Sequence, residues 1–191
     1  MEHQVGYHDG MTSLWAKCLL LLAGLWLVGW VKAAEPTTGT AKIATGSEVR
    51  GPDAWFPLTV GEKTLRVQLV VTLDEQQRGL MGRRDLGSDD GMVFVYPAPQ
   101  EMSFWMRGTP TPLDIGFFKE DGSLGEVYPM YPFDETPVKS IGRDYTLALE
   151  TPQGWFAKNN IKPGMKLKLA DVAAALRARG FKPSRYSAEP H

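Results

Sequence analysis

The segment from Trp105 to Asp114 (WMRGTPTPLD) holds the densest set of reactive side chains, with an aromatic ring, a guanidinium, hydroxyls and a carboxylate around two prolines. Such a stretch can form a stiff rim of polar groups beside an apolar wall, which is typical of a small-molecule site. Arg107, together with Arg83 or Arg84, could hold a carboxylate or phosphate through paired hydrogen bonds. Trp105 could stack on a sugar ring. We therefore expect a ligand-binding site built from Arg83, Trp105, Arg107, Thr109 and Asp114.

Two structural interpretations of the same segment stay open. Trp105 and Met106 could simply alternate across a strand. Asp114 could accept backbone N–H groups and pair with Arg107 instead of contacting a ligand. Functional sites with perturbed pKa values also contain a charge pair beside an aromatic ring. The pattern therefore favours neither a ligand site nor a structural role for Arg107 and Asp114.

Asp114 and Glu150 are candidate catalytic residues, because each closes or interrupts an apolar strand segment. Two carboxyl groups can act as acid and base in glycoside hydrolysis, where the distance between them sets the stereochemistry. A carboxylate-based hydrolase or lyase acting on an envelope or extracellular saccharide is therefore the alternative function. Carboxylates are common at strand ends, however, and neither His nor Cys is at hand for proton transfer. The sequence favours a non-enzymatic binding or accessory module for a polar, anionic or carbohydrate-like ligand.

The scarcest reactive residues lie at the two ends of the chain: the single cysteine is Cys18, and the histidines are His3, His8 and His191. If the N-terminal segment is removed, the mature domain has no cysteine and no histidine before its last residue. This argues against a disulfide, a Cys/His zinc site and a thiolate or His-activated nucleophile. Six methionines follow residue 33, but each lies in an apolar run that suits core packing better than Cu(I) binding. We expect no metal and no cofactor.

The charge balance narrows the range of partners. Lys and Arg total 21 against 22 Asp and Glu, which gives a net charge of −1. Nucleic-acid binding normally requires a markedly basic face. We expect no nucleic-acid partner and consider a small polar or anionic ligand instead, while the sequence indicates no particular protein partner.

Residues 1–33 have the pattern of an export signal. Lys17 precedes an apolar run of 14 residues that Lys32 closes, which is shorter than the ~20 residues that a membrane-spanning helix needs. Small side chains at Val31 and Ala33 predict cleavage after Ala33. An uncleaved N-terminal anchor is the alternative. We expect a periplasmic or secreted protein with no integral membrane span after cleavage.

The remaining chain is organised as short strands separated by turns. Residues 34–52 predict a flexible spacer, residues 53–170 a single mainly β domain, and residues 171–191 a C-terminal helix and tail. Strands are predicted at 56–60, 64–71, 92–96, 102–106, 113–118, 124–128, 138–141, 145–150 and 165–169. Helices are predicted after a capping box at Thr72 to Glu75, after Thr151–Pro152 and after Asp171. This pattern indicates an antiparallel β-sandwich or a partly open barrel with two or three short helices.

Six fragments in a fixed order carry a resemblance to a known family. They are Gly79–Arg83 (GLMGR), Gly91–Phe94 (GMVF), Phe104–Thr109 (FWMRGT), Pro112–Ile115 (PLDI), Tyr145–Glu150 (YTLALE) and Gly154–Trp155. Together they resemble the uncharacterised "domain of unknown function 192" family over about residues 56 to 170. That family typically has Asn where this chain has Gly108. The resemblance implies a compact, mainly β and often exported domain, and it brings no established reaction, cofactor or partner.

Overall fold

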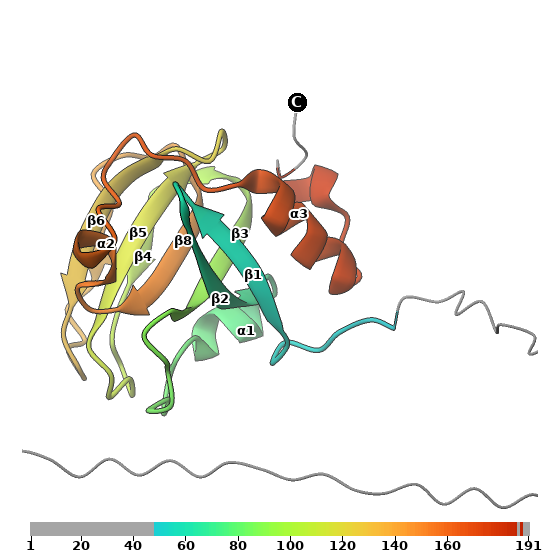
Figure 1. The fold of residues 1–191 in the computed structure, drawn as a ribbon. Coiled ribbons are helices and arrows are strands. Elements are labelled where there is room, and N and C mark those ends of the chain that lie inside the picture. The colour runs from blue at the N-terminus through green and yellow to red at the C-terminus, as the bar shows by residue number, and fades with distance from the viewer. Residues whose placement is uncertain (1–47, 187, 189–191) are drawn as a thin grey trace, which may run out of the picture. The chain divides into compact units, whose positions relative to one another are not determined.

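A six-stranded sheet forms the centre of the fold in the computed structural model, which describes residues 48–186 and 188. The strand order across the sheet is β1-β2-β3-β8-β5-β6 (Figure 1). These strands are β1 (Trp55–Val60), β2 (Lys63–Val70), β3 (Asp90–Gln100), β5 (Leu113–Lys119), β6 (Leu124–Met130) and β8 (Tyr145–Pro152). A second, small sheet pairs β4 (Ser103–Phe104) with β7 (Val138–Lys139). The predicted signal peptide, most of the spacer, and every cysteine and histidine lie outside the described residues.

The large sheet is mixed, because β2 and β3 run parallel while every other neighbouring pair is antiparallel. Parallel strands need a long connection that returns the chain to the starting end of the sheet. Residues 71–89 make this connection, and they contain helix α1 (Leu73–Arg78). The prediction of a mainly β fold with short helices is confirmed, and the sheet stays open instead of closing into a barrel. The parallel pair departs from the antiparallel pattern because α1 interrupts the run of hairpins.

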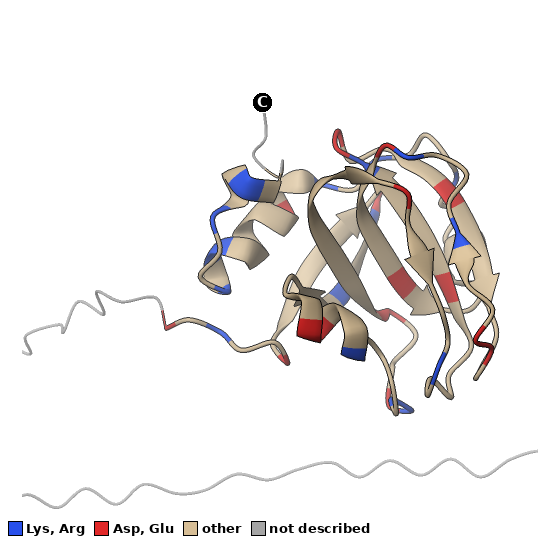
Figure 2. Ribbon diagram, turned by 180° about the vertical axis from the view of Figure 1, so that it is seen from behind, with Lys and Arg blue, Asp and Glu red and all other residues tan. Residues whose placement is uncertain are grey.

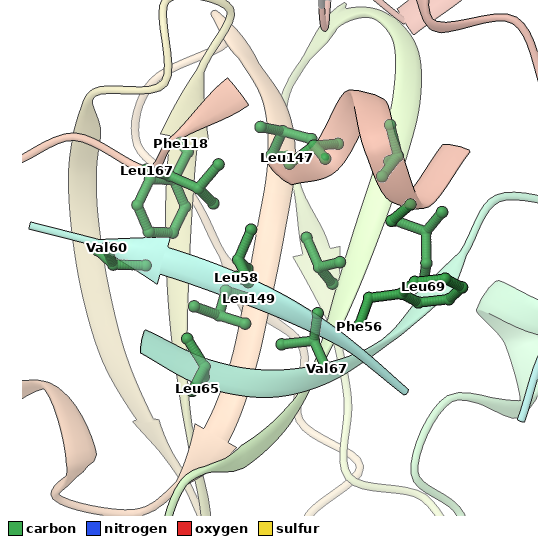
Figure 3. Packing of buried hydrophobic residues seen from close by; sticks show 14 of the residues in the cluster. Phe56, Leu58, Val60, Leu65, Val67, Leu69, Phe118, Leu147, Leu149 and Leu167 are labelled. Atoms are coloured by element: carbon green, nitrogen blue, oxygen red, sulfur yellow. The ribbon is translucent and has the colours of Figure 1, made fainter. Parts of the chain in front are cut away.

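One hydrophobic core lies on the face of the sheet that β1 and β2 curl over (Figure 3). Alternate side chains of neighbouring strands meet there, among them Leu58, Val67 and Leu149. Two helices complete the cluster: α2 (Trp155–Lys158) contributes Trp155, and α3 (Leu169–Ala178) contributes Leu176. Each fully buried side chain of this size contributes about 1.5–3 kcal/mol, so this core fixes both helices on the sheet.

A second core occupies the opposite face, because the strands alternate. Val93 and Val95 belong to the first cluster, whereas Phe94 belongs to the second. The ring of Phe104 in β4 packs edge-on against Phe94 with centroids 4.9 Å apart. Met106, from the segment after β4, is also buried here. The small sheet and its flanking loops therefore cover much of this face, and α1 lies beside them.

The first residues of α1 and α2 show where local capping signals predicted a helix start correctly and where they did not. The capping box of α1 is present: the Thr72 hydroxyl accepts the Glu75 N–H, and the Glu75 carboxylate accepts the Thr72 N–H. The prediction that Thr151–Pro152 starts the next helix is wrong, because β8 continues through Pro152 and α2 is capped by Gly154. Main-chain pairing with β5 holds those two residues in the sheet.

The C-terminal part also differs from expectation. Asp171 is not the N-cap of α3, which starts after Lys168; its carboxylate accepts the N–H of Thr59 instead, at 3.0 Å. The strand predicted at residues 165–169 is reduced to isolated bridges, Val60 with Leu167 and Ser123 with Lys166. The short connection into α3 prevents a longer ladder.

Charged residues of both signs are interspersed over the sheet and its loops (Figure 2). Across residues 48–186, none of the helices combines the length and the apolar character that a membrane span requires.

Candidate functional site

The candidate site is centred on Glu150, near the end of β8. Glu150 pairs with Met92 of β3 on one side and with Ile115 of β5 on the other. Directly paired residues point to the same face of a sheet. The Glu150 side chain therefore projects into the second core, where a hydrophobic residue would be expected.

Glu150 is a buried carboxyl group without a partner. Only 5% of the residue is exposed, and Oε2 has no hydrogen-bond partner within the part of the chain that the structure describes. Burial disfavours the charged carboxylate and raises the pKa of Glu150 to about 8. The group is therefore mainly protonated at neutral pH. An unpaired buried polar group costs free energy, so its presence needs a functional or structural reason.

A cavity of about 90 Å³ lies beside Glu150. Its walls come from three parts of the fold: α1 with the turn that follows it, the neighbouring strands β3 and β8, and β4 with the segment that follows it. Glu150 lines this cavity together with Gln76, Leu80, Tyr96, Phe104, Trp105, Arg107 and Thr109. The candidate site is thus a small pocket with an acidic group in its wall and aromatic rings around it.

Tyr96 also lines this pocket, and the charge of Glu150 affects its pKa. Burial, and then the charge of Glu150, raise the pKa of Tyr96 to about 12. Its hydroxyl therefore stays protonated throughout the physiological pH range and can donate a hydrogen bond. Tyr96 and Glu150 together bring two titratable groups, a phenol and a carboxyl group, to the pocket.

Helix α1 is held firmly at the pocket wall. The amide of Gln76 donates to the carbonyls of Val71 and Val95, at 3.3 and 3.2 Å, which ties the helix to the sheet. Glu75 forms an ion pair with the buried Arg179, the residue that follows α3. Arg179 also donates to the carbonyl of Leu69 in β2. The C-terminal helix thereby anchors the helix that lines the pocket.

The segment after β4 is shaped by backbone hydrogen bonds. The Met106 N–H donates to the carbonyl of Asp134 at 2.8 Å, and the Gly82 N–H donates to the carbonyl of Gly108 at 2.8 Å. Gly108 has a φ of +63°, a left-handed conformation that Gly adopts freely and Asn tolerates better than other residues. Asn, which the family that the sequence resembles typically has at this position, would tolerate the same conformation.

Trp105 and Arg107 lie at the mouth of the pocket. Trp105 is 45% exposed, whereas Met106 between them is 2% exposed and fills the core. The Arg107 guanidinium lies over the Trp105 ring, 5.4 Å from its centroid. Within residues 48–186, Arg107 takes part in none of the ion pairs, so its charge is free to meet a ligand.

The structure brings only three of the predicted ligand-binding residues to this pocket: Trp105, Arg107 and Thr109. Arg83 lies elsewhere, where it donates to Asp85 at 2.6 Å and to the side chain of Gln68 at 2.8 Å. Trp105 and Met106 do alternate between solvent and core, but they follow β4, which ends at Phe104, so this alternation does not lie within a strand.

Asp114 does not belong to the Glu150 pocket. It pairs with Thr151, the neighbour of Glu150, so the two carboxyl groups point to opposite faces of the sheet. Asp114 accepts the Gly154 N–H at 2.8 Å, and burial raises its pKa. The structure therefore does not bring Asp114 and Glu150 together to act on one bond, and Asp114 forms no pair with Arg107. Its interaction with a backbone N–H is the structural alternative that the sequence left open.

Sequence reasoning missed Tyr96, Gln76 and Phe104. Tyr96 is a polar-tipped aromatic at the end of an apolar strand, immediately before Pro97, which is a weak signal for a pocket wall. Gln76 and Phe104 carry no local signal, because only the packing of α1 and β4 on the sheet brings them to Glu150. No group of three or more His, Cys, Asp or Glu side chains able to hold a metal ion occurs within the described residues.

The family model DUF192, described as "Uncharacterized ACR", matches residues 56–169. The chain belongs to the DUF192 family. That match includes every residue of the large sheet except Trp55, and every residue of the pocket described above. The search of curated proteins finds no match.

Two solved structures are similar to this DUF192 chain. A protein of unknown function from Novosphingobium aromaticivorans is 34% identical, with a TM-score of 0.57, and the alignment covers 63% of this chain and 94% of that one. A protein from Sinorhizobium meliloti, described as a putative transcription regulator, is 27% identical, with a TM-score of 0.57 and coverage of 62% and 95%. The shared part is therefore the domain itself.

Proposed function

We propose that this DUF192 chain is an exported, non-enzymatic module that binds a small polar ligand in the Glu150 pocket. The observation that carries the proposal is a buried carboxyl group that lines a cavity and whose Oε2 atom has no hydrogen-bond partner in the described part of the chain. Leaving such a group unsatisfied costs about 1–3 kcal/mol. A ligand that hydrogen-bonds to Glu150 removes this cost on binding, which makes the pocket selective for a polar molecule over an apolar one.

The residues at the mouth of the pocket support the same function. Arg107 forms no ion pair with the described residues, and Trp105 is 45% exposed. Such a combination of an apolar wall and a few directed polar groups is the usual composition of a ligand site. We do not propose the paired-carboxylate hydrolase, because Asp114 and Glu150 lie on opposite faces of the sheet.

Export is the part of the proposal that rests on sequence. The apolar run before Lys32 has the length and flanks of a signal peptide. We propose that cleavage after Ala33 releases the chain into the periplasm or the medium. Mass spectrometry of the chain recovered from the cell envelope and medium is expected to find Ala34 as the first residue. Recovery of uncleaved chain in the membrane fraction alone would contradict this proposal.

Thermal unfolding of the purified full-length chain with a panel of sugars, organic acids, amines and amino acids tests the binding function. A ligand at 100 times its Kd adds about 2.7 kcal/mol to the free energy of unfolding. We expect at least one class to raise the Tm of the wild type but not that of the Glu150→Gln or Arg107→Gln variant. Arg84→Gln is the matched control, because Arg84 is exposed and does not line the pocket. Equal shifts in all four proteins would refute the site.

A further inference from the structure

The pocket contains groups of opposite character at its two ends. Inside, the Oε2 atom of Glu150 has no hydrogen-bond donor among the residues that the structure describes. At the mouth, the Arg107 guanidinium lacks a carboxylate partner among residues 48–186. A ligand that satisfies both must carry a hydrogen-bond donor at one end and an acceptor, preferably an anionic one, at the other.

The inner end of the pocket favours a cationic donor. An ammonium group offers three N–H donors and no acceptor, so it complements a carboxylate and would stabilise the ionised form of Glu150. The aromatic walls act in the same direction, because ring faces attract cations. Phe104 and Tyr96 both line this cavity. An anionic group placed beside Glu150 would instead hold the carboxyl group in its protonated form and could accept only one hydrogen bond from it.

The size of the pocket limits the ligand further. One water needs about 10–15 Å³ of such space, so a cavity of about 90 Å³ has room for roughly six waters. A molecule with about that many non-hydrogen atoms fills it. The smallest molecules that combine an ammonium group and a carboxylate are simple amino acids.

We propose that the Glu150 pocket binds a small zwitterion of the amino-acid type, with its ammonium group at Glu150 and its carboxylate at Arg107. This inference rests on the proposed binding function and names the ligand class for the same pocket. It also replaces the anionic or carbohydrate-like ligand that the sequence favoured, because the group buried inside the pocket is an acid and not an arginine.

Proton release provides a direct signature of the contact with Glu150. With a pKa of about 8, Glu150 is about 90% protonated at pH 7 and half protonated at pH 8. An ammonium ligand that ionises Glu150 therefore displaces about 0.9 proton at pH 7 and about half a proton at pH 8. Calorimetric titration in buffers of different ionisation enthalpy measures this number.

Three probes of equal heavy-atom count separate the two ends of the ligand. They are alanine, alaninamide, which lacks the carboxylate, and lactate, which lacks the ammonium group. Titrated into the full-length chain, alanine is expected to bind most tightly and to release about 0.9 proton at pH 7. Alaninamide should bind about tenfold more weakly with the same proton release, and lactate should bind without proton release, if at all. Tighter binding of lactate than of alanine would overturn the inference.

Variants assign each end to its residue. Glu150→Gln keeps the size and neutrality of the protonated acid, and we expect it to lose proton release and to bind alanine at least about tenfold more weakly. Arg107→Gln should weaken the binding of alanine to the affinity of alaninamide, and it should leave the affinity for alaninamide unchanged. Asp114→Asn, on the opposite face of the sheet, and Arg84→Gln are the controls, and both should bind alanine as the wild type does.

The outcomes distinguish this inference from the broader proposal. If another polar compound binds the wild type and is lost in Glu150→Gln, while alanine does not bind, the binding function stands and the zwitterion is refuted. If no compound binds, both fail. Alanine binding that persists unchanged in Glu150→Gln would place the zwitterion elsewhere and overturn the inference.

Discussion

Replacing Glu150 by Gln should change how the stability of the protein depends on pH. Burial raises the pKa of Glu150 from 4.5 to about 8, so between these pH values the folded protein keeps a proton that the unfolded chain has lost. The free energy of unfolding of the wild type therefore falls as the pH rises through this window and levels off above pH 8. At about 1.4 kcal/mol per pKa unit, the cost is about 3 kcal/mol at pH 7 and approaches about 5 kcal/mol at higher pH.

The Glu150→Gln variant has no proton to lose at this position. Its free energy of unfolding, minus that of the wild type, should increase by about 3 kcal/mol between pH 4.5 and pH 7. The fixed cost of burying the Gln amide cancels in this comparison, as do the other carboxyl groups that both proteins share. Urea denaturation followed by tryptophan fluorescence at several pH values measures the difference. Parallel stability profiles for the two proteins would refute the reasoning that Glu150 is a neutral, unpartnered acid.

Three further predictions concern other parts of the fold. Arg179→Met should lower the free energy of unfolding by about 3–5 kcal/mol in urea denaturation, because it leaves Glu75 and the Leu69 carbonyl without their buried partner; a loss below about 1 kcal/mol would contradict this. Glu126 accepts four hydrogen bonds; burial alone would raise its pKa, but the four donors lower it to about 2. Glu126→Gln should therefore cost about 2 kcal/mol at pH 7 after solvent screening, and the loss should shrink as the pH falls from 4.5 towards 2, so a loss independent of pH would refute it. At Gly108, Asn should cost less than about 1 kcal/mol and Val more, since φ is +63°; equal Tm values for both variants would show that the left-handed conformation is not required.

The local sequence predicted those features that depend on neighbours in the chain. The capping box at Thr72 and Glu75 formed as expected, because both of its hydrogen bonds are made within one helical turn. The family membership was also correct, as were most strand segments, although the strands predicted at 102–106 and 138–141 are shorter and the one at 165–169 is reduced to isolated bridges. Local signals failed where a distant segment offered a better partner. Asp171 caps no helix because the N–H of Thr59 binds its carboxylate, and Thr151 remains in β8 because β5 pairs with it.

The candidate site shows the same difference between local signals and contacts with distant segments. The sequence identified Trp105, Arg107 and Thr109 as one group because they are close along the chain and belong to one loop. It could not exclude Asp114, which follows them closely but points to the other face of the sheet. It named Glu150 and Asp114 together as candidate catalytic residues, whereas the strand register places them on opposite faces. A strand pattern shows alternation without showing which neighbouring strand lies beside it.

By itself, the sequence determined a mainly β domain of the DUF192 family and a restricted chemistry, in which no cysteine and no histidine lies between residues 19 and 190. Only the tertiary structure decided that Glu150 is buried without a hydrogen-bond partner among the described residues, and that Tyr96, Phe104 and Arg107 line its pocket. The physical reason is that burial and strand register arise between segments far apart in the chain. A carboxyl group has an ordinary pKa in the unfolded chain. That pKa shifts only when the folded sheet and its covering loops remove the group from water.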